Sequence, residues 1–290
     1  MKGQGVHDTL RKDQGCSMPL SLAHWAGLAA MTMACLLGMI HWRLAMITLS
    51  IYALMCAAAP FFPRIGFFAP VIYRGNSGSP AVALTFDDGP DPLSTPALLE
   101  LLDGHRILAT FFVSGSKVVQ YPHLVKAIIR QGHMIGNHSY HHDPLVYFKG
   151  GRAIRDEIES TQKALKPFGV LPRAYRPPVG IVGPGLRQPL RDAGLRVINF
   201  NCRAFDRGNK NITGMATRIL RRVRSDDIIL LHDSMPLGEA GLRPWLKEME
   251  TLLWGLKHRG LSVRPLQELI GKPVMNFTEY PSLGSRSSKS

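Results

Sequence analysis

The hydrophobic pattern begins with two long uncharged runs. Residues 14–42 contain no Asp, Glu, Lys or Arg, and residues 20–40 are apolar over a length that crosses a hydrocarbon core as a helix. After Arg43 a second uncharged run covers residues 44–62 and ends at two prolines, which a helix does not easily continue through. The pattern therefore predicts a transmembrane helical hairpin.

Two other interpretations of these runs were weighed. A pair of buried helices in a soluble core is less favoured, because consecutive uncharged runs of this length are uncommon in soluble domains. A cleavable signal sequence is rejected, because its apolar region typically spans only about 7–15 residues. The Lys and Arg residues flanking the runs favour both ends on the cytoplasmic side of a bacterial inner membrane. A single crossing would instead place the following domain on the opposite side.

Beyond residue 80, short β-rich runs alternate with segments of helical periodicity, which is typical of an α/β domain with mainly parallel strands. About seven strands with intervening helices favour a barrel-like α/β fold. The predicted strands cover residues 81–86, 109–113, 133–137, 173–176, 195–201, 227–231 and 261–264. The predicted helices cover residues 95–102, 117–130, 152–166, 184–193, 212–223 and 242–258.

This pattern divides the chain into five predicted segments. They are an N-terminal tail (1–19), two transmembrane helices (20–62), an apolar and aromatic interfacial linker (63–80), the α/β domain (81–268) and a polar, partly disordered tail (269–290).

Composition narrows the classes of partner. The 290 residues include 35 Lys and Arg against 21 Asp and Glu, a formal net charge of +14, which permits an anionic partner. The basic residues are spread thinly and no nucleic-acid-binding motif is present, so we expect no nucleic acid and favour a membrane surface. Four scattered cysteines are too few for a disulfide framework or a zinc ribbon.

Adjacent carboxylates follow the first predicted strand, in the sequence Thr85-Phe86-Asp87-Asp88-Gly89-Pro90. Catalytic groups gather at the carboxyl ends of strands in parallel α/β folds. Two carboxylates whose side chains diverge can divide the work, one binding a cation while the other takes a proton from water. On its own, an Asp-Asp-Gly sequence is more often a polar turn.

Three further groups follow later strands. His138 and His142 are four residues apart and, with a carboxylate, can form a three-ligand metal site that leaves positions open. Arg176-Pro177-Pro178-Val179-Gly180 is a rigid loop that can aim a backbone N–H. His232 ends an apolar strand, where a general acid is useful, although a histidine there is often simply packed in the core.

Taken in this order, the four groups resemble the motifs of the polysaccharide deacetylase family, also called the NodB-homology or carbohydrate esterase family 4 domain. The match covers roughly residues 81–266. The resemblance implies a distorted (β/α) barrel, a divalent metal, usually Zn²⁺, and hydrolysis of an acetamido group on a sugar. It also implies roles for individual residues: Asp87 as base, Asp88, His138 and His142 as metal ligands, His232 as general acid, Arg176 as the partner of Asp87, the Val179 N–H as an oxyanion donor beside Pro178, and Asp206 as the partner of His232.

The chain also departs from the family pattern. The fourth motif usually reads Asp-x-x-Asp-Trp, whereas residues 203–207 read Arg-Ala-Phe-Asp-Arg, and the third motif commonly has an aromatic residue where this chain has Val179. We interpret these changes as affecting the sugar pocket. Arg203 and Arg207 favour a phosphorylated sugar or one linked to polyprenyl phosphate.

The sequence therefore predicts a membrane-anchored, metal-dependent N-deacetylase. Its substrate would be an amino sugar in a cell-envelope polysaccharide or a lipid-linked glycan precursor. Two alternatives stay open, namely a deformylase of a formamido sugar on a polyprenyl-phosphate carrier and a non-catalytic, membrane-tethered glycan-binding module.

Overall fold

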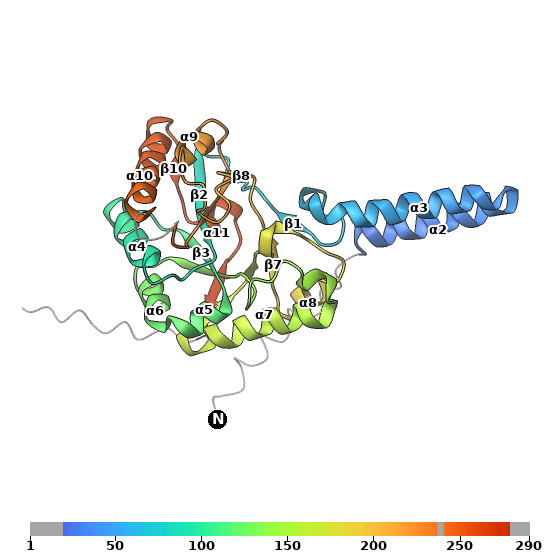
Figure 1. Ribbon diagram of the computed structural model, residues 1–290, viewed down its shortest axis with the longest axis horizontal. Coiled ribbons are helices and arrows are strands. Elements are labelled where there is room, and N and C mark those ends of the chain that lie inside the picture. Colours follow the sequence, from blue (N-terminus) through green and yellow to red (C-terminus); the bar gives the residue numbers. More distant parts are fainter. Residues whose placement is uncertain (1–19, 237–240, 279–290) are drawn as a thin grey trace, which may run out of the picture. The chain divides into compact units, whose positions relative to one another are not determined.

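The computed structural model describes residues 20–236 and 241–278, and these fall into two compact units that meet in sequence between Ala58 and Ala59. The first unit contains helices α2 (Leu22–Ile40) and α3 (Trp42–Ala58). The second contains every strand of the described residues (Figure 1).

Helices α2 and α3 form a hairpin. His41 between them has an extended backbone and ends α2. The Tyr52 hydroxyl donates a hydrogen bond to the Ala23 carbonyl at 3.1 Å, and a Cβ at Gly27 would lie 2.8 Å from the same hydroxyl. This packing confirms the two predicted apolar helices. The segments Leu22–Ile40 and Trp42–Phe61 are long and apolar enough to cross a membrane, and insertion itself stays a prediction.

The second unit is built on a curled, open parallel sheet. Its path runs β1-β7-β6-β4-β3-β2-β9-β8, and β10 pairs with β2 beside this path. These strands are β1 (Val71–Ile72), β2 (Ala81–Asp87), β3 (Thr110–Val113), β4 (Met134–Asn137), β6 (Ala174–Tyr175), β7 (Arg196–Ile198), β8 (Cys202–Arg203), β9 (Ile228–His232) and β10 (Ser262–Val263). A separate antiparallel pair joins β5 (Val170–Pro172) to β11 (Met275–Phe277). The sheet confirms the predicted barrel-like α/β fold.

Helices surround this sheet (Figure 1). They are α4 (Ser94–Gly104), α5 (Gly115–Gln120), α6 (Pro122–Arg130), α7 (Gly151–Leu165), α8 (Arg187–Asp192), α9 (Met215–Leu220), α10 (Leu242–His258) and α11 (Leu266–Ile270). Helix α7 buries Ile154, Ile158 and Leu165 on one face, as their three- and four-residue spacing predicts. Strand β2 is buried along its whole length because both faces of the sheet are covered, so its sequence is continuously apolar up to Thr85.

All seven predicted strands are present, with three differences in detail. The predicted helix at 117–130 is two helices, because Pro122 starts α6 and cannot donate the hydrogen bond that would continue α5. The predicted strand at 195–201 ends at Ile198, and the chain then leaves β7 to form β8 beside β9. Strands β1, β5, β8 and β11 were not predicted, since two or three residues are too few to show a period.

The boundaries of the five predicted segments stay predictions. Strand β1 falls within the 63–80 segment and pairs with β7, and Phe67 and Phe68 beside it are buried. Strand β11 falls within the 269–290 segment, following the buried Val274. Residues 1–19 and 279–290 lie outside the described residues.

Gly136 offers a test of how tightly the sheet packs. A Cβ at this position on β4 would lie 2.5 Å from the Phe112 ring, which is fully buried. We expect Gly136→Ala to reduce the free energy of unfolding by about 1–3 kcal/mol through overpacking. Thermal unfolding of the full chain measures this. The control is Gly104→Ala at the exposed end of α4, where a Cβ meets nothing within 4 Å. Equal midpoints for the two variants would contradict the packing described here.

Candidate active site

The predicted site residues meet at the carboxyl edge of the sheet. Asp87 at the end of β2 is in register with His232 at the end of β9, and Val113 of β3 is in register with Asn137 of β4. Asn137 is in turn in register with Tyr175 of β6. The residues that follow these strands, Asp88, His138 and Arg176, therefore emerge side by side, because parallel strands all end at the same edge.

Asp88, His138 and His142 bring one ligand atom each to a common point. Asp88 Oδ1 lies 3.4 Å from His138 Nε2 and 3.1 Å from His142 Nε2, and the three atoms lie within 4.8 Å of one another. One carboxylate with two imidazoles is a common ligand set for a divalent cation such as Zn²⁺, and it leaves coordination positions free.

The surroundings of this trio suit a cation. Asp88 Oδ1 is buried, and none of the described residues donates a well-oriented hydrogen bond to it. The Nδ1 of His138 lies 2.8 Å from the Arg176 carbonyl, and donation to that carbonyl leaves Nε2 free to coordinate. Although burial opposes it, the His138 and His142 rings hold the pKa of Asp88 below its usual value. Likewise, Asp87 and Asp88 raise the pKa of the buried His138, so the site attracts positive charge.

Asp87 is held apart from this trio by Arg176. The Arg176 Nη1 donates to Asp87 Oδ1 at 2.7 Å, and both side chains are buried. The other oxygen, Oδ2, lies 3.7 Å from His138 Nε2 and therefore faces the point where the ligand atoms meet. This arrangement suits a base that accepts a proton from a water molecule held near a cation.

His232 stands opposite, with Asp206 behind it. The two side chains are joined at 2.8 Å between Nδ1 and Oδ2. Burial alone would lower the pKa of His232, but the bond to Asp206 and the charges of Asp206, Asp88 and Asp87 raise it to about 9. The imidazole is therefore protonated at neutral pH, as a general acid requires.

One cleft of about 810 Å³ is lined by Asp87, Asp88, His138, His142 and His232 and by four further predicted residues, Val179, Arg203, Asp206 and Arg207. Val179 is 58% exposed and has a left-handed backbone (φ 52°), following the buried Pro178. Arg203 and Arg207 also line the cleft, on the segment that contains Asp206. Every predicted site residue except Arg176 and Pro178 lines this cleft. Arg176 is hydrogen-bonded to Asp87, and Asp206 is hydrogen-bonded to His232.

Left-handed backbone conformations gather around the cleft. Non-glycine residues with positive φ include Asp88, Ser139, His142, Val179 and Arg207. Such conformations are costly and persist where the surrounding structure holds them in place. These residues lie at the turns that carry the predicted site residues. The rest of the structure therefore holds the side chains in place although the backbone is strained.

Two supporting groups were missed by the sequence analysis. Glu157 of α7 accepts hydrogen bonds from the backbone N–H groups of Tyr140 and His141, each at 2.8 Å, and so fixes the loop between His138 and His142. Asp233 is buried below the site and accepts hydrogen bonds from Ser94 and Thr95 at 2.7 and 2.6 Å. Burial raises the pKa of Asp233 to about 7. The periodicity of α7 does not indicate that Glu157 contacts the histidine loop. The only sequence signal for Asp233 is its position next to His232.

Comparison with known proteins places this arrangement in a family. Residues 74–198 match the family model described as polysaccharide deacetylase. A chitooligosaccharide deacetylase from Bradyrhizobium sp. (strain ANU 289) is 31% identical over 206 residues, which cover 68% of this chain and 94% of that protein. The chain belongs to the polysaccharide deacetylase family.

Two further similar proteins support membership of the polysaccharide deacetylase family. The peptidoglycan-N-acetylglucosamine deacetylase PgdA of Listeria monocytogenes is 34% identical over 200 residues, covering 69% of this chain but only 41% of PgdA. The solved structure of the Bc1960 peptidoglycan N-acetylglucosamine deacetylase is similar with a TM-score of 0.65 at 26% identity, covering 70% of this chain and 94% of that one. The predicted enzyme class, a hydrolase of N-acetyl amide bonds on sugars, is confirmed.

The His232–Asp206 pair predicts a pH effect that does not require turnover. In metal-free protein we expect Asp206→Asn to lower the pKa of His232 from about 9 by at least roughly one unit, because the carboxylate favours the imidazolium. The pKa is measured by NMR titration of the ring. Since the pair raises the folded-state pKa, it stabilises the fold fully below about pH 6.5 and loses this effect as pH rises through about 9. A variant whose melting temperature differs from the parent's equally at pH 6 and pH 10 would contradict this.

Proposed function

We propose that the chain is a membrane-anchored, metal-dependent N-deacetylase of an amino sugar in a cell-envelope glycan or its lipid-linked precursor. The observation that carries this is the convergence of Asp88, His138 and His142, with the second carboxylate oxygen of Asp87 3.7 Å from His138 Nε2. That arrangement supplies a cation site and a separate base, which are the two requirements of amide hydrolysis by an activated water.

Asp88, His138 and His142 would hold the metal, and their two imidazoles and one carboxylate match the ligands that Zn²⁺ prefers. A divalent cation bound there would polarise the acyl carbonyl and lower the pKa of a water molecule.

The protein's own groups would then move two protons. Asp87, oriented by Arg176, accepts a proton from the water whose oxygen forms the new bond to the acyl carbon. His232, held by Asp206, donates a proton to the sugar nitrogen as the carbon–nitrogen bond breaks, releasing acetate and a free amine. The backbone N–H of Val179, beside Pro178, would stabilise the oxyanion of the tetrahedral intermediate.

The family relatives support an acetyl group on a glycan. The chitooligosaccharide deacetylase and PgdA are named for such substrates. The same site geometry would also hydrolyse a formamido group, which is the alternative left open by the sequence, and measurement of formate beside acetate distinguishes the two. Retention of the complete ligand set and of Asp87 argues against a module that only binds glycan.

The matched pair Asp87→Asn and Asp88→Asn tests the division of roles. We expect Asp88→Asn to weaken Zn²⁺ binding, measured by titration calorimetry, by at least about tenfold, because one charged ligand is lost. Asp87→Asn should bind Zn²⁺ within a few-fold of the parent while acetate release falls by roughly 10²–10⁴. Removal of metal by chelation should abolish acetate release, and added Zn²⁺ should restore it. Equal loss of metal binding in both variants would refute the separate roles.

The apolar hairpin supports a second prediction, on topology. Two spans return the chain to the side on which it started, and the flanking Lys and Arg residues favour the cytoplasmic side of a bacterial inner membrane. We expect the full chain to resist extraction from membranes at alkaline pH. A fluorescent reporter fused after Ser290 should be active, whereas an alkaline phosphatase fused there should not. The opposite pattern would indicate a single crossing and an external catalytic domain.

A further inference from the structure

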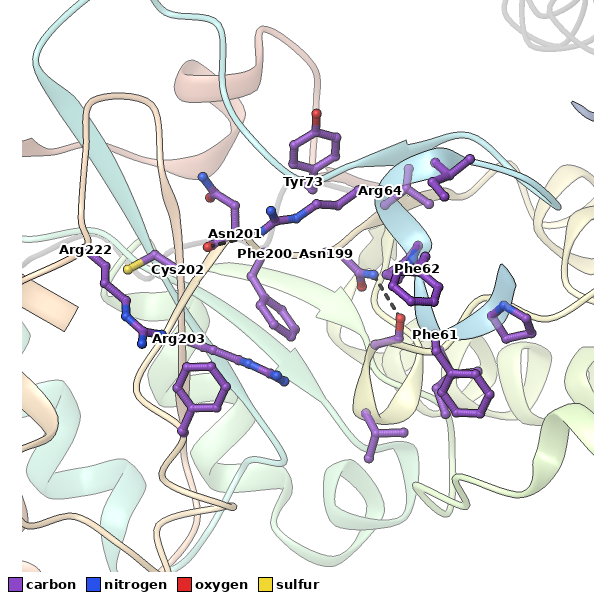
Figure 2. A pocket seen from close by; sticks show the side chains of 18 residues that line it. Phe61, Phe62, Arg64, Tyr73, Asn199, Phe200, Asn201, Cys202, Arg203 and Arg222 are labelled. Carbon is purple, nitrogen blue, oxygen red and sulfur yellow. Dashed lines mark hydrogen bonds between the residues drawn. The ribbon is translucent and has the colours of Figure 1, made fainter. Parts of the chain in front are cut away.

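A second cavity adjoins the catalytic cleft. It encloses about 630 Å³ and shares Val179, Gly180, Phe200, Arg203 and Phe205 with the cleft, so the same side chains form a wall of both. Figure 2 shows Arg203 and Arg222 on one side of this cavity and Phe61 and Phe62 on the other. We call it the arginine pocket.

The charges of this pocket are unbalanced. Its lining contains Arg64, Arg203 and Arg222 and, among the described residues that line it, no Asp or Glu. None of the three guanidinium groups has a carboxylate within 4 Å in residues 20–236 and 241–278. The nearby Asp227 lies behind Asn201, to which it is hydrogen-bonded, and faces Arg74 at 3.5 Å.

The guanidinium groups are nevertheless oriented. Arg203 and Arg222 both lie over the ring of Phe205, with their guanidinium carbons 4.3 and 5.2 Å from its centroid. Stacking occupies the faces of these groups and leaves the N–H edges free, since within the described part of the chain neither side chain donates a hydrogen bond. Both guanidinium groups therefore present a positive charge and free N–H edges, which suit an anion.

The other wall is apolar and belongs to the end of a candidate membrane span. Pro60 and Phe61 line the pocket, and the span Trp42–Phe61 ends at the same residues. Phe61, Phe62 and Ile65 are 64%, 59% and 59% exposed. Exposed apolar side chains of this size at the end of a span suit contact with an acyl or prenyl chain.

From these observations we propose that the arginine pocket binds the phosphate of a lipid-linked amino sugar, with the lipid leaving past Phe61 and Phe62. This rests on the deacetylase function proposed above and names its substrate class. The acylated nitrogen then lies in the catalytic cleft while the phosphate ester lies in the pocket that shares its wall. Arg203 contributes to both, because it lines both cavities.

Equilibrium binding tests this without turnover. The full chain carrying Asp87→Asn, in lipid nanodiscs, is titrated with N-acetylglucosamine, N-acetylglucosamine 1-phosphate, the decyl phosphodiester of that sugar, and inorganic phosphate. We expect the 1-phosphate to bind at least about tenfold more tightly than the unphosphorylated sugar, and the decyl diester about tenfold more tightly again. The phosphate gain should shrink as salt is raised.

Matched variants locate the effect. Arg222→Gln should remove most of the gain from phosphate, while Arg221→Gln, a neighbouring exposed arginine outside the pocket, should retain it. Phe61→Ala should remove most of the gain from the decyl chain, while Val119→Ala, an exposed apolar residue outside both cavities, should not.

Three outcomes would overturn the proposal: equal affinity for the sugar with and without phosphate, equal effects of the two arginine variants, or inorganic phosphate binding as tightly as the diester. The last would assign the pocket to free anions. The proposed deacetylase function is tested separately, by acetate release from an unphosphorylated N-acetylglucosamine oligosaccharide. Its failure would leave the binding differences intact, so the two can be told apart.

Discussion

The buried ion pair between Arg176 and Asp87 ties together most of the strands that form the site. Besides Asp87, the guanidinium donates to Thr85 Oγ1 of β2 at 2.8 Å and to the carbonyls of Ile198 and Asn199, at 3.0 and 3.2 Å. Its face lies 4.0 Å from the centroid of the Phe112 ring on β3. The Arg176 carbonyl lies within hydrogen-bond distance of Nδ1 of His138, which follows β4. One side chain and its own backbone thus connect β2, β3, β4, β6 and β7.

Such an arrangement explains why Asp87 and Asp88, although adjacent, have different partners. A fully buried guanidinium is tolerated only when its charge is paired and its N–H groups are satisfied, so Asp87 is committed to it through one oxygen. Asp88 follows in a left-handed turn (φ 71°), which directs its carboxylate to the two histidines instead. The end of β2 and the turn after it therefore give two identical side chains different surroundings.

The sequence was sufficient to predict the fold class, the seven main strands and the residues at their carboxyl ends. Strands such as β2 and β9 are continuous apolar runs, and the polar residues that follow them stand out. Other features depend on contacts between segments far apart in the chain and have no local pattern. Asp233 is recognised only when Ser94 and Thr95 approach it, and Glu157 only when α7 packs beside the histidine loop. Pro122 could have indicated the break between α5 and α6. The break was not predicted because the helical periodicity of apolar residues continues across it.

The wall formed by Phe61 and Phe62 has a practical implication for anyone who works with this enzyme in solution. The usual way to make such a protein soluble is to remove the chain up to the end of its apolar segment. Here that cut would also remove part of the lining of a cavity that shares wall residues with the cleft of the candidate active site. A shortened protein could keep its reaction chemistry intact and still misreport which substrates the complete chain prefers.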